Sequence, residues 1–392
     1  MIRFISPEHP ANRVNATLRT AIETAQGNLL HHRFTDAHEF MTRVFDDSRL
    51  AMAAPEELRG QPLNALTELR SRELSEYVRT ELLRAGVPEQ MVNHQALAVV
   101  ERVRLLTAFD QPDAAVENVV GKVEEIVGGF PRTHEDILCG RNPGDVLDPF
   151  ILTATQSLLF GGSIEQTVEA TVAHKALMMI EGLLGHLHED VIGQMRGNVR
   201  VPEPRGVDQE TLSPELNPFP GSDVLQPPYA QGEKFRFHQI KSKTGSAKGG
   251  DGLRLGQQLE ALRQLYDAEV YYHALIGNTL RGHRSRAGVE RGAPSVVVLV
   301  GKASFNCLTH TGVGPELLLR LYQSAFATVA HRTGYRVDTM AAAIVAHFLE
   351  RAQQEGEGFL EIILEEATDG PIEQQDNRHF VGGRRGRSNG GR

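Results

Sequence analysis

Apolar residues recur at intervals of three and four positions through the first third of the chain. The spacing is clearest over 73–83 and 96–106, and the strict alternation typical of strands is scarce there. Such spacing gathers the apolar side chains on one face of a helix. It predicts successive α-helices from residue 11 to about residue 130.

Changes in composition divide the chain further. Glycine and proline are frequent over 129–149, and the helical spacing then returns over 164–192. Because such turn-rich segments separate structural elements, we expect an α-helical region over 1–150 and a second domain over 151–381. The last residues, 382–392, are rich in glycine and arginine and predict a flexible basic tail.

Strand patterns are confined to the second half of the chain. Short β-prone pieces occur at 198–201 and 222–225. The segment 234–241 begins with strict alternation, and its apolar positions indicate a register that shifts near His238. The Val/Leu run over 295–301 is typical of a strand that is buried on both faces.

Helical spacing accounts for most of the remainder. A Gly-rich loop over 243–252 precedes a predicted helix over 253–279, and two further helices are expected over 315–333 and 338–354. The segment 358–366 fits an edge strand or a short helix. The predicted fold class is therefore α/β (α+β), with a mixed central sheet flanked by helices and a large α-helical N-terminal region.

Composition and charge narrow the possible functions. The chain has 392 residues, 40% of them hydrophobic, and a net charge of −9, so it repels polyanions except at local basic surfaces. Its two cysteines, Cys139 and Cys307, exclude a disulfide framework and a cysteine-rich zinc site, which favours a cytoplasmic location. We expect neither export nor membrane insertion, because no long apolar segment is present.

One pair of short motifs carries chemistry. Asp223 stands in the sequence Gly221-Ser222-Asp223-Val224 at a short strand, and Gln239-Ile240-Lys241 lies on the clearest strand. Helix, three short strands, helix and strand follow one another around them. This order and these motifs resemble the PD-(D/E)XK nuclease superfamily over roughly residues 156–312.

Hydrolysis of a phosphodiester needs a hard divalent cation and an activated water, and carboxylate and carbonyl oxygens suit such an ion. Asp223 supplies a carboxylate. Residues 239 and 241 share one strand face, which places Lys241 where it could orient or deprotonate the attacking water. The resemblance implies Mg²⁺ as cofactor and adds the carbonyl of Ile240 as a ligand.

The chain departs from the family at Gln239, which stands where a second carboxylate is expected. An amide oxygen can bind Mg²⁺ but brings no charge. We expect Glu181 on the preceding helix to supply the missing acid, with Glu260 on the following helix as the second choice. Asp113 and Asp148 are weaker rivals of Asp223, and the histidines, including His186 and His188, are expected at the surface or at helix caps.

Basic and polar residues near these motifs are candidates for contacts with DNA phosphates or bases. The candidates are Lys243, Lys248, Arg254, Arg281, Arg284, Arg286, Lys302, Ser304 and Asn306. The alternative interpretation is that the loops carrying the basic residues are only solvated. For Lys302, Ser304 and Asn306, the alternative is that they form a turn. Both interpretations remain open.

Within the superfamily, a single core with an added helical region most resembles a type II restriction endonuclease. That resemblance implies a homodimer that cuts a palindromic site in double-stranded DNA with Mg²⁺, beside a cognate DNA methyltransferase in the same cell. The alternatives are a structure-selective repair or recombination nuclease, a DNA-binding protein with a degenerate nuclease core, and a helical interaction protein.

Overall fold

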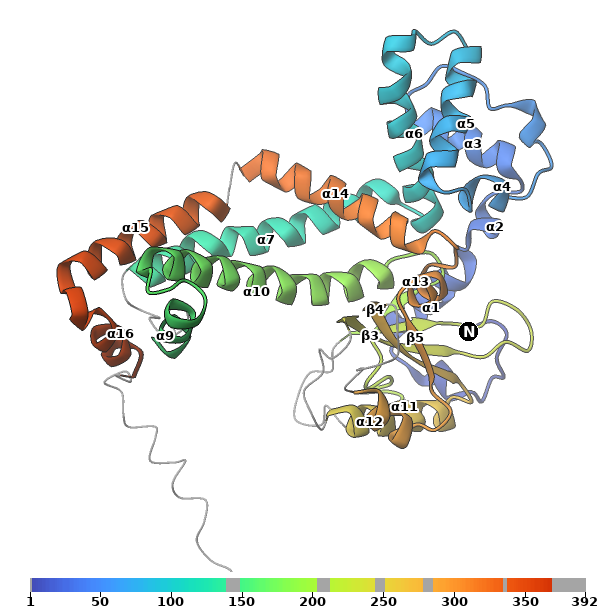
Figure 1. Ribbon diagram of the computed structural model, residues 1–392. Coiled ribbons are helices and arrows are strands. Elements are labelled where there is room, and N and C mark those ends of the chain that lie inside the picture. Colours follow the sequence, from blue (N-terminus) through green and yellow to red (C-terminus); the bar gives the residue numbers. More distant parts are fainter. Residues whose placement is uncertain are drawn as a thin grey trace, which may run out of the picture. The chain divides into compact units, whose positions relative to one another are not determined.

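The computed structural model describes residues 2–138, 149–202, 212–243, 251–277, 285–333 and 337–368 (Figure 1). The chain divides into two compact units. The first unit contains Met1–Val123 and Leu183–Val329, and the second contains Glu124–Gly182 and Ala330–Arg392. This division differs from the boundary expected near residue 150, because three long helices each contribute residues to both units.

These three helices are α7 (Pro112–Leu138), α10 (Ile164–Gly193) and α14 (Gly314–Thr333). Helix α7 continues through residues 129–138, where the sequence indicated turns. In the second unit, α16 (Phe359–Thr368) packs against α9 (Pro149–Leu158) and α15 (Val337–Glu355). The segment 358–366 is thus helical rather than an edge strand.

The first unit begins with the short helices predicted from the apolar spacing. Side chains cap two of them, since Asn15 accepts a hydrogen bond from Leu18 N and Asp36 accepts one from Glu39 N. The buried faces of α3, α5 and α6 form one apolar core. The helices are α1 (Ala16–Gly27), α2 (Leu30–Arg33), α3 (Ala37–Asp47), α4 (Asn64–Thr67), α5 (Ser71–Arg84) and α6 (Glu89–Ala108).

A five-stranded sheet forms the other part of the first unit, in the order β1-β2-β3-β4-β5. The first three strands pair antiparallel, and β4 and β5 continue parallel to β3. Helices α11 (Asp251–Leu265) and α12 (Arg286–Gly292) connect the parallel strands. The strands are β1 (Val199–Arg200), β2 (Val224–Gln226), β3 (Arg236–Lys243), β4 (Glu269–Ile276) and β5 (Val297–Val300).

Helices cover both faces of the sheet (Figure 1). Apolar residues of α1, α11 and α12 pack on one face, where Phe237 and Tyr272 are fully buried. Helix α13 (Lys302–Thr309) packs against β4 and β5. Helices α11 and α12 cross closely through glycines, since a Cβ at Gly256 would lie 2.4 Å from the Val289 oxygen.

Three predictions about this region need correction. The helix predicted over 253–279 ends at Leu265, and β4 occupies its second part, because Tyr271 and Tyr272 belong to a strand buried between β3 and β5. The Val/Leu run of β5 lies at the sheet edge and is only partly buried. The predicted register shift near His238 is also wrong, since β3 pairs continuously with β4 from Arg236 to Lys241.

The order helix, three-strand antiparallel meander, helix and parallel strand is present as α10, β1–β3, α11 and β4. The strand that completes this order is β4, not the Val/Leu run of β5. Among the described helices, none is both long and apolar enough to cross a membrane.

Candidate functional site

Asp223 lies directly before β2, beside the middle of β3. Its backbone N–H donates to the His238 carbonyl at 2.8 Å, which extends the β2–β3 pairing by one residue. Gly221 makes the preceding turn with a φ of +79°, and a Cβ there would lie 2.9 Å from Gln258 of α11. The tight turn and the ladder together fix the position of the Asp223 carboxyl group.

The two predicted motifs meet at this point. The Asp223 Oδ2 atom accepts hydrogen bonds from the Ile240 backbone N–H at 2.6 Å and from the Gln239 amide at 2.5 Å. The same Gln239 nitrogen lies 3.4 Å from the Ile240 carbonyl oxygen. Two oxygen acceptors therefore converge on the Gln239 amide group.

The side chains of Gln239 and Lys241 point to the same face of β3, as the strand period of two requires. Gln239 is 4% exposed, whereas Lys241 is partly exposed at the end of the strand. The exposure of the two residues therefore increases along β3 from Gln239 to Lys241.

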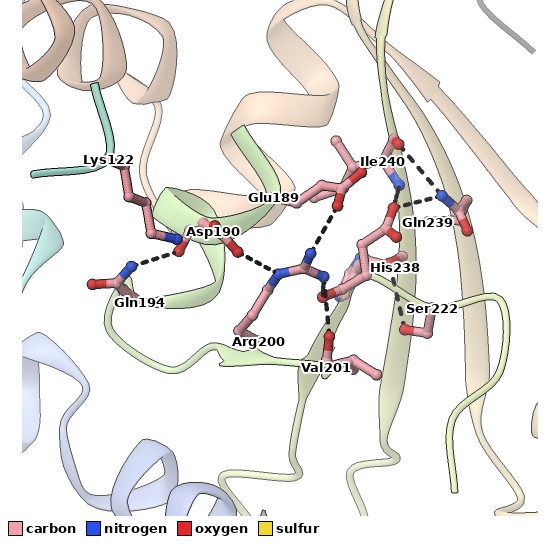
Figure 2. A network of polar contacts seen from close by, with 11 residues as sticks. Lys122, Glu189, Asp190, Gln194, Arg200, Val201, Ser222, His238, Gln239 and Ile240 are labelled. Carbon is pink, nitrogen blue, oxygen red and sulfur yellow. Dashed lines mark hydrogen bonds and ion pairs between the residues drawn. The ribbon is translucent and has the colours of Figure 1, made fainter. Parts of the chain in front are cut away.

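An arginine links the Asp223 segment to α10 (Figure 2). The Arg200 guanidinium donates to the Asp223 carbonyl at 3.0 Å and to the Glu189 carboxylate at 2.8 Å. It also contacts Asp190 at 2.8 Å, and Asp190 in turn pairs with Lys122. One guanidinium group therefore joins two acids of α10, Glu189 and Asp190, to the Asp223 segment.

Helix α10 approaches the sheet through two glycines on the face that carries Glu189. A Cβ at Gly185 would lie 3.6 Å from the Ser242 hydroxyl of β3, and one at Gly193 would lie 2.6 Å from the Arg200 Cβ. Positions 185, 189 and 193 are four residues apart and share one helix face. Small residues on both sides of Glu189 let the helix pass close to β3 and β1.

The sequence predicts Glu181 or Glu260 as the supplementary acid. Glu181 belongs to the second compact unit, whereas Asp223 belongs to the first. The Glu260 carboxylate is paired with Arg263 at 2.7 Å on its own helix and also accepts a bond from Gln264. Glu189 is a further acid that Arg200 joins to the Asp223 carbonyl, and it was not among the predicted residues.

The spacing of glycines around Glu189 is the sequence signal that could have identified it. His188 was expected at the surface or at a helix cap, but burial lowers its pKa to about 4 and it shares a hydrogen bond with Tyr322 of α14 at 2.9 Å. The rival Asp113 is paired with Arg102 at 2.6 Å at the start of α7. Asp148 lies outside the described residues.

The candidate DNA-contacting residues differ in their exposure and in their partners. Arg254 on α11 and Lys302 on α13 are exposed, and Arg286 is paired with Glu290 at 2.7 Å. Ser304 is fully buried, so its assignment to a DNA groove is wrong. The Asn306 amide faces the carbonyls of Lys302, Thr311 and Gly312, so this side chain stabilises the local turn. Lys248, Arg281, Arg284 and the side chain of Lys243 lie outside the described residues.

A scan of the sequence against protein-family models finds no match, and a search of curated proteins finds none. Asp223 and Glu189 offer carboxylate oxygens and Ile240 offers a carbonyl oxygen. Oxygen donors of this kind suit the chemistry of a hard divalent ion such as Mg²⁺.

Proposed function

We propose that this protein is a Mg²⁺-dependent nuclease of the PD-(D/E)XK type that hydrolyses phosphodiester bonds in double-stranded DNA. One observation carries the proposal. Asp223 and the Gln239-Ile240-Lys241 tripeptide, sixteen residues apart, meet through the 2.5 Å and 2.6 Å hydrogen bonds to the Asp223 carboxylate. They do so within a helix, antiparallel meander, helix and parallel strand order.

Each residue has a distinct task in this proposal. The Asp223 carboxylate and the Ile240 carbonyl would hold the metal ion, and the Gln239 amide could rotate to offer its oxygen to the same position. Mg²⁺ bound there would supply charge neutralisation at the phosphate and would acidify a bound water. Lys241, on the same face of β3 as Gln239, would orient the attacking water and stabilise the negative charge that develops in the transition state.

Glu189 supplies the negative charge that Gln239 lacks. In the structure this charge is compensated by Arg200, which also holds the Asp223 carbonyl. Arg200 therefore acts as a positioning residue, because it fixes the acid of α10 and the segment before β2 relative to each other. We therefore propose Glu189 as the supplementary acid in place of Glu181 or Glu260.

The substrate proposal is a specific site in duplex DNA, cut by a homodimer in the manner of a type II restriction endonuclease, with a cognate DNA methyltransferase protecting the cell's own DNA. Cations on the first unit support a nucleic-acid surface in an otherwise acidic chain. Arg254 and Lys302 are exposed and Lys241 is partly exposed. Two-fold symmetry in the protein would match a palindromic site.

Digestion of a long, sequenced, unmethylated DNA tests the proposal directly. We expect discrete ends that require Mg²⁺, vanish with EDTA, and are lost in Asp223→Ala and Lys241→Ala. Glu189→Gln should reduce cleavage strongly, whereas Glu260→Gln should leave it unchanged because Glu260 is engaged by Arg263. Intact DNA with all proteins, each shown to be folded by circular dichroism, would refute the nuclease proposal.

The same experiment separates the two alternatives. A structure-selective nuclease would cut branched DNA and leave random or no ends in linear duplex. A DNA-binding protein with a degenerate core is favoured by the uncharged Gln239 and by the cation Arg200 beside Glu189. It would shift DNA in a gel at low salt without Mg²⁺-dependent cleavage, and Lys241→Ala would leave that behaviour unchanged.

A further inference from the structure

A second polar cluster lies on the sheet face opposite to Gln239 and Lys241. It consists of His238 on β3, His273 on β4 and Cys307 on α13, and one ligand atom from each lies within 4.8 Å of the others. Both histidines are fully buried and Cys307 is half-buried. Side chains alternate along a strand, so His238 points away from Gln239. The cluster is separate from the candidate nuclease site.

Hydrogen bonds in this cluster leave buried atoms unpaired. His238 Nδ1 and His273 Nε2 lie 3.0 Å apart and share one hydrogen bond. Within the described part of the chain, His238 Nε2, His273 Nδ1 and the Oε1 atom of Gln226 have no partner. Gln226 is a neighbour, since its Nε2 donates to the Cys307 carbonyl at 3.1 Å. These unpaired nitrogens are not the two that lie 3.0 Å apart, so each imidazole still has a second polar atom that the described residues do not satisfy.

We propose that His238, His273 and Cys307 bind a divalent transition-metal ion with the ligand preferences of Zn²⁺. Imidazole and thiolate suit Zn²⁺, whereas Mg²⁺ and Ca²⁺ select oxygen donors. Two imidazole nitrogens on one tetrahedral Zn²⁺ lie about 3.3 Å apart, from bonds of about 2.0 Å. The 3.0 Å separation of His238 Nδ1 and His273 Nε2 is close to that spacing.

A metal ion at this position needs a free lone pair on each imidazole and a deprotonated thiol. Binding would replace the S–H bond of Cys307 by a sulfur–metal bond and release the proton to solvent. The bound ion joins β3, β4 and α13 on the reverse side of the strand that carries Gln239 and Lys241.

Cobalt substitution tests the site in the full-length protein. Chelator-treated protein titrated with Co²⁺ should bind one equivalent at this site and develop visible d–d bands together with a near-ultraviolet sulfur-to-cobalt charge-transfer band. Zn²⁺ should abolish both signals, and Mg²⁺ should not. Elemental analysis of protein purified without chelator should find about one Zn²⁺ per chain, or identify another transition metal in its place.

Two cysteines provide a matched pair of variants. Cys307→Ser should lose the charge-transfer band, whereas Cys139→Ser should retain it. Asp223→Ala should also retain it, which separates this site from the nuclease site. Absence of the band in wild-type protein would overturn the proposal whatever the variants do, as would a band that survives Cys307→Ser. A crystal structure with ordered water among the three side chains, grown with Zn²⁺ present, would overturn it as well.

Discussion

Replacement of Arg200 by methionine tests the network that joins α10 to the Asp223 segment. The guanidinium donates to Glu189, Asp190 and the carbonyls of Val201 and Asp223 at 2.8–3.1 Å. Its side chain is 22% exposed, and the two carboxylates are 15% and 26% exposed. Methionine has a similar length but no donor, so Glu189 loses its cation and two backbone carbonyls lose a bond.

Removing one partner of a buried ion pair costs about 3–5 kcal/mol, because the remaining charge stays desolvated without compensation. The first compact unit has about 270 residues, and an unfolding entropy of about 2.1 cal/mol/K per residue gives about 0.6 kcal/mol/K. The expected decrease in Tm is therefore about 5–9 °C. Lys122 continues to pair with Asp190 in the variant, so the loss should not exceed this range.

Differential scanning calorimetry of wild type, Arg200→Met and Arg263→Met measures the effect. Arg263 also pairs with a carboxylate, at 2.7 Å, but its side chain is 36% exposed and its partner lies on the same helix. Its replacement should lower the Tm by less than about 2 °C. Equal shifts in the two variants would refute the reasoning, because burial of the Arg200 network would then have no energetic consequence.

Two further outcomes follow from the structure. Gly256→Ala should lower the Tm by about 2–5 °C, because its Cβ would meet the Val289 oxygen at 2.4 Å, whereas Gly121→Ala on α7 meets nothing within 4 Å and should raise it slightly. Burial alone would raise the pKa of Asp190, but hydrogen bonds from Lys122 and Arg200 lower it. The stability it contributes is present above its unfolded pKa of about 3.9 and is lost as the pH falls through the folded pKa. The Tm difference between wild type and Asp190→Asn should accordingly shrink from about pH 5 to about pH 3, and a difference that does not change with pH would contradict this assignment.

The spacing of apolar residues in the sequence was enough to predict the N-terminal helices, α10 and strand β3. Apolar spacing of three and four marked the N-terminal helices and α10, and alternation marked β3, because these periods follow directly from backbone geometry. The pairing of Asp223 with the Gln239 tripeptide was also predictable, since the residue types and their order were present in the sequence. The hydrogen bonds to the Asp223 carboxylate place these residues together.

Tertiary structure decided what periodicity could not show. Strand β4 was mistaken for the end of a helix, because a strand covered on both faces carries apolar residues without alternation. The link from Glu189 through Arg200 to the Asp223 carbonyl depends on where α10 passes the sheet, and Gly185 and Gly193 let the helix approach it closely. His238, His273 and Cys307 are far apart in sequence, and strand pairing and the packing of α13 bring them together.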